Sequence, residues 1–410
     1  MRHLWILNHY AQEPGGAGGT RHFHFAEHLE EHGWSTSIIA ASVEHQTGVQ
    51  RLRNDENYRI ELYKGVPFLW LKTPTYCGNK LWRTVNIATY FLQALRPNIA
   101  NQLTSPDVII GSSVHPLAAL AGMILARRHR VPFIFEVRDL WPQTLIDMGR
   151  LKESSALTWV LRKMELLLYK RAARVVVLLP RAWEYIAPLG ISKCKIVWIP
   201  NGVDLAMFSQ SADPLSSDAF SLMYFGSHGQ ANGLDNILRA MKLVQGSPDG
   251  HRISLRMIGD GPLKLALIAL SNELGLKNVI FEPPVPKNQI PSLAAEAHAF
   301  IFNLIDAPVF KYGISSNKLF DYMVAERPII FSCNSTNNPI NEAHAGLTVS
   351  ADNPEELAEA ILKIAATPLE KRKDMGRAGR NYIEKNYGFA QLSERLAVVL
   401  NEVMAEKHSK

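Results

Sequence analysis

This 410-residue chain alternates short, continuous apolar runs with segments of helical periodicity along almost its whole length. The first series of runs comprises Leu4–Leu7, Ser37–Ala41, Val108–Ile110, Phe133–Phe135, Val175–Leu179 and Ile196–Ile199. The second series comprises Ser221–Phe225, Ile253–Ile258, Val279–Phe281, Phe300–Phe302, Ile329–Ser332 and Leu347–Val349. Such runs, most of them followed by a helix, are typical of parallel strands that are covered on both faces. The pattern therefore predicts an α/β protein with two doubly wound sheets.

The two series are separated by Phe208–Phe220, a stretch rich in Ser, Asp, Ala and Pro that is predicted to be a linker. The chain is also longer than one ordinary domain. We expect a first domain over residues 1–204 and a second over residues 205–388, with a final helix (residues 389–410) that packs back on the first. Open parallel sheets bind ligands beyond the carboxyl ends of their strands. A cleft between two such domains is the expected site.

Composition argues against several classes of protein. Hydrophobic residues make up 47% of the chain and charged residues 20%, which is ordinary for a globular protein and argues against disorder. The three cysteines lie far apart, so neither a disulfide framework nor a metal cluster is expected. The net charge of +6 lacks the basic block interleaved with aromatics that nucleic acid binding favours. No apolar run reaches the roughly 20 residues needed to cross a bilayer, so we expect a cytoplasmic protein, soluble or peripheral to a membrane.

A glycine-rich loop, residues 14–21, lies between the first predicted strand and its helix. Glycines let a backbone approach a ligand closely, and a helix N-terminus favours negative charge. Gly18, Gly19 and Arg21 are therefore candidates for contact with a phosphate or a sugar. A flexible loop with glycines at tight turns is an equally supported alternative. The dinucleotide fingerprint G-x-G-x-x-G fails, because its third glycine would fall on Arg21.

The most informative stretch is the start of a predicted helix at Lys318, where Ser315, Ser316 or Asn317 would act as N-cap. Lys318 would lie in the first turn, where the helix dipole disfavours a cation by about 0.3–1 kcal/mol unless an anion binds there. Asp321 follows three residues later, on the same face. A lysine for a phosphate and a carboxylate for a ribose diol match the two ends of a nucleotide diphosphate sugar. Taken alone, the spacing favours the alternative, a surface ion pair worth roughly 0.2–0.5 kcal/mol.

With motifs elsewhere, this stretch resembles the retaining glycosyltransferases of family 4, whose GT-B fold has two Rossmann-like domains facing a central cleft. The motifs are the Gly18-Gly19 loop, Val114–Pro116, Ile199–Asp204, Tyr224–Gly226, Ile258–Pro262 and Phe281–Pro286. They cover essentially the whole chain. The S-x-N-K-x-F-(D/E)-Y-M pattern around Lys318 and the R-D-L-W-P motif from Arg138 to Pro142 are similar to those of bacterial surface-polysaccharide transferases, including fucosamine-transferase-like members.

The resemblance implies particular donor contacts. Asp321 falls where the family has the second glutamate of its E-x7-E motif, expected on the ribose, while Gly313 replaces the first. The Arg and Lys that the family tends to have after the second domain's first strand are missing near Ser227 and Asn232. Lys318 is our candidate for their charge. The donor-binding residues expected on this basis are Gly18, Gly19, Arg21, Gly226, Gly229, Val285, Ser316, Asn317, Lys318 and Asp321.

His115 resembles the family histidine placed near the transferred sugar. It follows the Val108–Ile110 run, so it belongs to a strand-end loop where a neutral imidazole can bind a sugar hydroxyl. A loop histidine bonded to its own backbone is the alternative. His115 and Lys318 are the expected catalytic residues. Arg138 and Asp139 stand after another run and could meet the donor or the acceptor, or form a local ion pair.

The reaction that the resemblance implies is retaining transfer of a sugar from a nucleotide diphosphate donor, UDP-linked, to a lipid-linked saccharide in O-antigen or capsule synthesis. The expected sugar is an N-acetylated hexosamine or deoxyhexosamine. The leaving diphosphate gains negative charge, which Lys318 and backbone N–H groups would stabilise. No cofactor or metal is expected to be required, since the family implies no obligatory metal and no D-x-D triplet occurs.

Two stretches are candidates for contact with a membrane or with the acceptor. Apolar residues recur at helical spacing between Lys80 and Arg96, which predicts a membrane-facing helix or, more simply, a helix packed on its sheet. A later basic group is either a solvated helix face or a patch for anionic lipid. That group consists of Arg162, Lys163, Lys170, Arg171 and Arg174. The resemblance favours a peripheral enzyme on the cytoplasmic face of the inner membrane.

Three other functions remain open from the sequence. A UDP-sugar 2-epimerase of the same fold would act without an acceptor and would need acid/base carboxylates. A non-catalytic sugar-nucleotide-binding subunit would explain the missing charges at Gly313 and near Ser227. A nicotinamide dehydrogenase, with Glu44 on a ribose, is the weakest alternative because the dinucleotide fingerprint fails.

Overall fold

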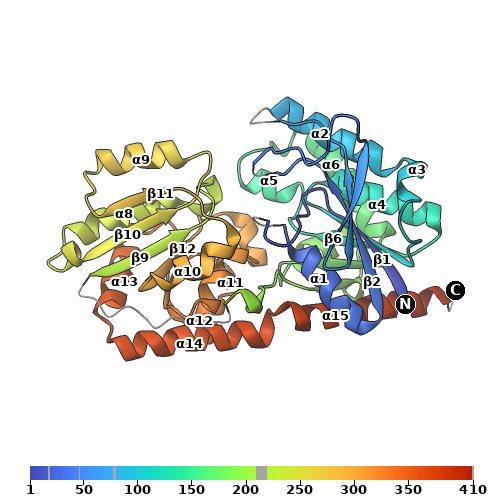
Figure 1. Ribbon diagram of the computed structural model, residues 1–410. Coiled ribbons are helices and arrows are strands. Elements are labelled where there is room, and N and C mark those ends of the chain that lie inside the picture. The colour runs from blue at the N-terminus through green and yellow to red at the C-terminus, as the bar shows by residue number, and fades with distance from the viewer. Residues whose placement is uncertain (17–18, 46, 77–79, 209–218, 409–410) are drawn as a thin grey trace. The chain divides into compact units, whose positions relative to one another are not determined.

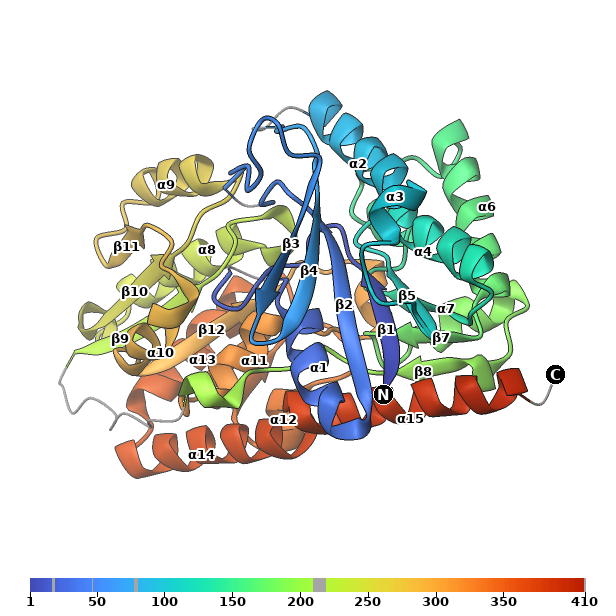
Figure 2. The same ribbon diagram turned by 45° about the vertical axis from the view of Figure 1, so that its right-hand side comes forward.

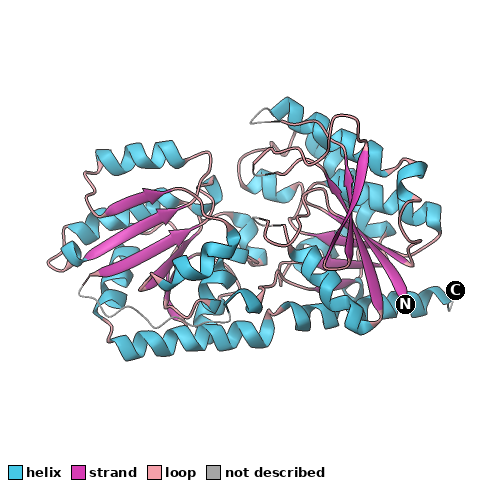
Figure 3. Ribbon diagram, viewed as in Figure 1, coloured by secondary structure: helices cyan, strands magenta, loops and turns pink. Residues whose placement is uncertain are grey.

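The computed structural model describes residues 1–16, 19–45, 47–76, 80–208 and 219–408, and the chain divides into two compact units (Figure 1). Unit 1 consists of Met1–Asn201 and Phe389–Lys410, and unit 2 of Gly202–Gly388. Most of the predicted linker, Phe208–Phe220, lies outside the described residues. The α/β class with two doubly wound sheets is confirmed, and Figure 3 shows the strands of each unit lying between helices.

Unit 1 contains an eight-stranded sheet in the order β3-β4-β2-β1-β5-β6-β7-β8. Its strands are β1 (Arg2–Leu7), β2 (Trp34–Ala41), β3 (Tyr58–Tyr63), β4 (Val66–Leu71), β5 (Val108–Ser112), β6 (Phe133–Val137), β7 (Arg174–Val177) and β8 (Ile196–Trp198). Neighbours are parallel except β3 and β4, an antiparallel hairpin that the sequence analysis did not predict. Lys64 and Gly65 turn that hairpin with φ of 47° and 83°, as a tight two-residue turn requires.

Helices cover both faces of the unit 1 sheet (Figure 2). Leu4 and Ile6 of β1 face a core shared with α1 (Arg21–Leu29) and α15 (Phe389–His408). Between them Trp5 points to the other face, where its ring lies 4.9 Å from that of His129. That face carries α2 (Lys80–Ala94), α4 (Pro116–His129) and α6 (Ala156–Arg171). Shorter helices are α3 (Pro97–Ala100), α5 (Gln143–Asp147) and α7 (Trp183–Ile186).

Unit 2 contains a six-stranded parallel sheet in the order β11-β10-β9-β12-β13-β14. Its strands are β9 (Phe220–Phe225), β10 (Ile253–Ile258), β11 (Val279–Glu282), β12 (Ala299–Asn303), β13 (Ile329–Ser332) and β14 (Gly346–Val349). One face packs on α10 (Ile290–Ala295), α11 (Asn317–Val324), α12 (Pro339–Ala343) and α14 (Leu369–Asn386). The other packs on α8 (Leu234–Gln245), α9 (Lys264–Glu273) and α13 (Pro354–Ala366).

Within the described part of the chain, no helix has both the length and the apolar character that a bilayer crossing would need. In each unit, polar residues follow the carboxyl ends of the parallel strands. Open α/β sheets bind their ligands at this edge.

Candidate functional site

Lys318 lies in the first turn of α11, and its side chain reaches the carboxyl end of β9. Its Nζ donates a hydrogen bond to the Tyr224 hydroxyl at 3.1 Å and another to the side-chain oxygen of Asn232. The ammonium lies 4.7 Å from the ring centroid of Tyr224 and 4.9 Å from that of Phe302, which is cation–π geometry. Burial lowers the pKa of Lys318 to about 7, against a smaller opposing effect of Cys333. The side chain is thus held in place by neutral groups, and no carboxylate is among its hydrogen-bond partners in the described part of the chain.

Gly226 leaves room for this path of the Lys318 side chain. Its φ is +151°, and a Cβ built on it would lie 3.2 Å from Cδ of Lys318 and 3.3 Å from the Tyr224 hydroxyl. Any larger residue would therefore displace the lysine. Gly229, three residues later, has a φ of −102°, which other residues adopt as well. Of the two predicted glycines, only Gly226 is required by the local geometry.

Asp321 lies one turn after Lys318 but does not pair with it, since within the described ranges no salt bridge joins the two side chains. The surface ion pair favoured by the spacing alone is therefore wrong. Burial raises the pKa of Asp321 to about 6; Lys287 opposes this effect and Asp204 adds to it. No described residue donates a hydrogen bond to its half-buried carboxylate. The carboxylate can accept hydrogen bonds from a ligand.

The backbone before α11 explains one departure from the family motif. Gly313 has φ +101° and ψ 179°, a conformation essentially restricted to glycine, so a glutamate cannot stand there without a change of backbone. Ser316 occupies the N-cap position, as predicted, but its side chain makes no capping hydrogen bond. Asn317 is the exposed first residue of the helix, and half-buried Val285 packs against the core beneath α11.

His115 caps α4 at the carboxyl edge of the unit 1 sheet. Its Nδ1 accepts a hydrogen bond from the Ala118 amide at 3.3 Å. For this nitrogen, the alternative of a histidine bonded to its local backbone is therefore correct. The Nε2 atom is buried and has no hydrogen-bond partner. Burial lowers the pKa of His115 to about 3, with a further effect of Arg83. His115 is therefore neutral at physiological pH and keeps one nitrogen unused.

The guanidinium of Arg21 is occupied inside unit 1, which argues against the predicted donor contact through this side chain. Its guanidinium is only 3% exposed and donates through Nε to Glu136 at 3.0 Å and through Nη2 to the Ile199 carbonyl at 2.9 Å. Nη1 donates to the Pro200 carbonyl. Glu136 also accepts from His22 at 2.7 Å. Arg21 therefore joins strand ends inside unit 1, and all three of its nitrogens are occupied.

The glycine-rich loop is described only in part, since Gly18 lies outside the described residues. Gly19 has φ +65°, and its carbonyl accepts a hydrogen bond from the Gln12 amide at 3.2 Å. A Cβ at Gly19 would stand 2.5 Å from the Tyr10 carbonyl oxygen. Glycine is therefore required at this position because the Tyr10 carbonyl approaches the Gly19 backbone closely, and this requirement involves no ligand.

Arg138 and Asp139 follow β6. Within the described ranges they do not form the local ion pair that was the alternative to a ligand contact. The Arg138 amide donates to the Ser113 hydroxyl at 3.1 Å, and one of its guanidinium nitrogens is buried without a hydrogen-bond partner. Asp139 is exposed. A role of these two residues toward donor or acceptor stays a prediction.

The sequence analysis missed two buried histidines at these edges. His9 follows β1, is 1% exposed and lies with its ring centroid 4.7 Å from that of His115. His228 follows β9 and is fully buried, and no residue that the structure describes forms a hydrogen bond with either of its ring nitrogens. Burial, with a further effect of Lys264, lowers the pKa of His228 to about 4. The available signal was their position, two and three residues after the end of an apolar run.

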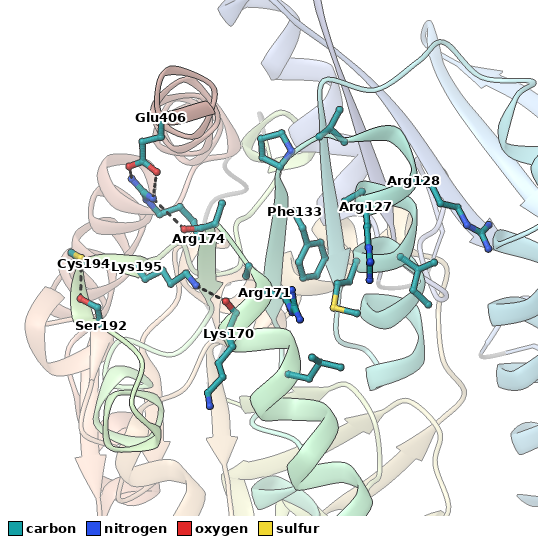
Figure 4. Close-up of a pocket in the computed structure, with 18 residues that line it drawn as sticks. Arg127, Arg128, Phe133, Lys170, Arg171, Arg174, Ser192, Cys194, Lys195 and Glu406 are labelled. Carbon is teal, nitrogen blue, oxygen red and sulfur yellow. Dashed lines mark hydrogen bonds and ion pairs between the residues drawn. The ribbon is translucent and has the colours of Figure 1, made fainter. Parts of the chain in front are cut away.

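A basic groove with a cavity volume of about 1320 Å³ lies elsewhere in unit 1 (Figure 4). Phe133 and Arg174, which begin β6 and β7, line it, so it opens at the amino edge of the sheet, opposite His115. Arg174 pairs with Glu406 at 2.5 Å. Its remaining cations come mainly from the C-terminal ends of α4 and α6, and they are Arg127, Arg128, Lys170, Arg171 and Lys195.

The predicted basic group is only partly available for a ligand. Besides Arg174, Arg162 is also paired, since it contacts Glu153 at 3.1 Å. Lys163, Lys170 and Arg171 remain exposed. Across the described residues, no group of three or more His, Cys, Asp or Glu side chains is arranged to hold a metal ion.

Comparisons with known proteins identify two matching family models. Residues 16–202 match the "Glycosyl transferase 4-like domain" and residues 219–367 match "Glycosyl transferases group 1". The chain is 23% identical over 318 residues to the "Probable glycosyltransferase WbjE" of Pseudomonas aeruginosa, covering 73% of this chain and 76% of that protein. It is 21% identical over 257 residues to the "Putative colanic acid biosynthesis glycosyl transferase WcaI" of Escherichia coli K12, covering 58% and 62%.

Solved structures share the fold at low sequence identity. Sucrose-phosphate synthase from Thermosynechococcus elongatus superposes with a TM-score of 0.75 at 15% identity, over 99% of this chain and all of that one. HepE from Anabaena, in complex with UDP-glucose, superposes with a TM-score of 0.65 at 14% identity, over 98% of this chain and all of that one. Both units of the chain thus have counterparts in known structures.

Proposed function

The chain belongs to the glycosyltransferases of GT-B type, and on that premise we propose that it moves a sugar from a UDP-linked donor to a lipid-linked saccharide during surface-polysaccharide synthesis. The transfer retains the anomeric configuration. The sugar is an N-acetylated hexosamine or deoxyhexosamine, in keeping with the sequence resemblance to surface-polysaccharide transferases. The complex of Anabaena HepE with UDP-glucose supports UDP as the carrier.

The observation that carries this proposal is the position of the Lys318 ammonium. It contacts Asn232 and Tyr224, close to the place after β9 where the family tends to have Arg and Lys. A single lysine from α11 therefore places a cation at the end of β9, where the family tends to have its Arg and Lys on the chain that follows the strand. Lys318 binds the donor diphosphate, and Asp321 on the next turn of the helix accepts hydrogen bonds from the ribose.

The chemistry asked of these residues is charge stabilisation. As the bond to the β-phosphate lengthens, negative charge grows on the leaving diphosphate, and a prepositioned cation stabilises that charge more than it stabilises the ground state. Because burial holds the pKa of Lys318 near 7, an arriving diphosphate would restore its full charge. The uncapped first turn of α11 supplies backbone N–H groups beside it. His115, as a neutral imidazole, binds a sugar hydroxyl.

Contact with a lipid-linked acceptor is supported by two helices on one face of the unit 1 sheet. The helix α2 packs on the sheet, as the simpler prediction expected, but Leu81 is 72% exposed and Trp82 50%, so these two apolar side chains stay at the surface. In α6, Trp159 is 64% exposed and lies beside the exposed Lys163. Apolar side chains with neighbouring cations are typical of a surface that lies on an anionic membrane. The basic groove at the C-terminal end of α6 adds further cations, among them Lys170 and Arg171.

The proposed function is tested by incubating the protein with a radiolabelled UDP-sugar panel and a lipid extract, and measuring label in the lipid phase. We expect transfer that is lost in Lys318→Met and retained in the surface control Lys242→Met. Epimerised sugar formed without lipid would establish the epimerase instead. Donor binding with no transfer to any lipid tried would favour the non-catalytic subunit.

Membrane contact is tested by flotation with vesicles of phosphatidylglycerol and phosphatidylethanolamine. The double variant Leu81→Ser with Trp82→Ser is expected to lose binding. The control Leu265→Ser removes an equally exposed leucine, 82% exposed, from α9 of unit 2 and is expected to bind as the wild type does. Equal binding by all three proteins would contradict the membrane surface on α2.

A further inference from the structure

His9 and His115 form a buried pair of imidazoles at the carboxyl edge of the unit 1 sheet. They follow the neighbouring strands β1 and β5, and their side chains belong to residues that are 1% and 4% exposed. Their ring centroids are 4.7 Å apart with the planes at 76°. His9 Nδ1 and His115 Nε2 are both buried without a hydrogen-bond partner. Two such atoms in neighbouring rings call for a ligand, because buried polar atoms are rarely left unsatisfied.

The neighbours of His9 determine which of its nitrogens carries the proton. The Asn86 side-chain nitrogen donates to the Pro74 carbonyl at 2.7 Å, which fixes the orientation of the amide. The Asn86 oxygen, 2.7 Å from His9 Nε2, must then accept, so Nε2 carries the hydrogen. Burial, with a further effect of His115, holds the pKa of His9 well below its usual value, so the ring is neutral. Its Nδ1 is therefore a bare acceptor.

His115 has the opposite arrangement. Its Nδ1 accepts from the Ala118 amide at 3.3 Å and cannot also carry a hydrogen. In the neutral ring the hydrogen is then on Nε2, the atom that lacks a partner. The pair thus offers one donor and one acceptor, and no charge, to a ligand that contacts both rings.

We propose that His9 and His115 hold a single sugar hydroxyl, which accepts a hydrogen bond from His115 Nε2 and donates one to His9 Nδ1; this rests on the proposed function. A hydroxyl is the common group that fills both roles at once. An ionised phosphate or carboxylate cannot donate to His9, and an ammonium cannot accept from His115. With their centroids 4.7 Å apart the rings are in edge contact, so the hydroxyl oxygen lies beside both rings rather than between them. His9 is then a specificity residue, positioned by Asn86.

The proposal is tested by measuring the affinities of UDP, UDP-glucose and UDP-N-acetylglucosamine for the full chain by calorimetry. His9→Phe keeps a ring of similar size but removes the acceptor, and we expect it to weaken binding of the preferred UDP-sugar about tenfold more than binding of UDP. His9→Asn places an oxygen near the position of Nδ1 and should recover part of that difference. His24→Phe is the matched control, because His24 is another buried histidine of unit 1, stacked at 4.6 Å on Phe389. It should leave the ratio unchanged.

A second measurement does not depend on the stability of the variants. In wild-type protein labelled with 15N at histidine, His9 Nδ1 should appear unprotonated and His115 Nε2 protonated. Both resonances should shift on addition of the UDP-sugar but not of UDP. Equal weakening of UDP and UDP-sugar by His9→Phe, or resonances that do not move when a UDP-sugar is bound, would overturn the hydroxyl assignment while leaving the proposed function intact. If no UDP-sugar binds the wild type, the proposed function fails and this inference with it.

Discussion

The carboxyl edges of the two sheets have the same architecture but opposite chemistry. In unit 2, Lys318 and Asp321 place a cation and a carboxylate on one helix, and the described residues give them no salt bridge to each other. In unit 1, the charges of Arg21 and Glu136 pair with each other, and His22 also binds Glu136. Among the described residues at that edge, the side-chain nitrogens without a hydrogen-bond partner include those of the neutral pair His9 and His115 and one of Arg138.

This difference means that the two sheet edges suit different chemical groups. Charges held next to neutral partners suit a diphosphate and a ribose, whereas neutral imidazoles suit hydroxyl groups and would not bind an anion strongly. A charged residue near a glycine loop is therefore not evidence of ligand contact until its partners are known. Four predictions probe this contrast, from the largest effect to the smallest.

Arg21→Met should lower the free energy of unfolding by about 3–5 kcal/mol, because it leaves Glu136 buried with a missing partner. Burial opposes the charge of Glu136, yet His22 and Arg21 hold its pKa well below the usual value. Urea denaturation followed by circular dichroism measures the loss. A cost below about 1 kcal/mol, within the range of surface pairs, would contradict the internal role of Arg21.

Lys318→Met should weaken UDP-sugar binding by about 1.5–3 kcal/mol through loss of charged hydrogen bonds. Binding of uridine, which carries no phosphate, should change much less. The free energy of unfolding at pH 7 should not fall in proportion, because the ammonium is already disfavoured by burial. Calorimetry with both ligands gives the comparison, and an equal effect on uridine would exclude the phosphate role.

Asp321→Asn should weaken donor binding by about 1–2 kcal/mol, since an amide accepts hydrogen bonds less strongly than a carboxylate. The contribution of Asp321 to the affinity should be full above its pKa of about 6 and should decline as pH falls through it, because protonation removes the ribose acceptor. The variant should lack that decline. An unchanged affinity in a folded variant would argue against the ribose assignment.

Donor binding should also take up a proton at pH 8. Free Lys318, with its pKa lowered to about 7, is then mostly neutral, and a bound diphosphate favours the ammonium. Affinity should rise severalfold as pH falls from about 8.5 to 7 and level off below. Without donor, the same group makes the fold more stable as pH rises from about 7 toward the ordinary lysine value of 10.5, because the unfolded chain still holds the proton. Calorimetry in buffers of different ionisation enthalpy counts the proton, and Lys318→Met should abolish it.

Much of the fold could be read from the sequence, because buried parallel strands leave an unmistakable pattern of apolar runs. The hairpin of β3 and β4 was missed because the alternating, half-exposed residues of β3 do not form such a run. α14 was not among the predicted helices; its Gly376 packs so closely that a Cβ would stand 2.2 Å from the Glu326 carbonyl oxygen. Contact of this kind between distant segments has no local signal.

For the candidate site, the chain itself determined that Lys318 and Asp321 share one face of a helix, because the helical period fixes residues three apart on the same side. It also placed His115 after a strand. Only the tertiary structure decided that Lys318 turns to Tyr224 and Asn232, that Arg21 is occupied by Glu136, and that His9 stands beside His115. The reason is that a side chain's partners come from strands far apart in sequence, and the partners decide whether a charge or a lone pair is left for a ligand.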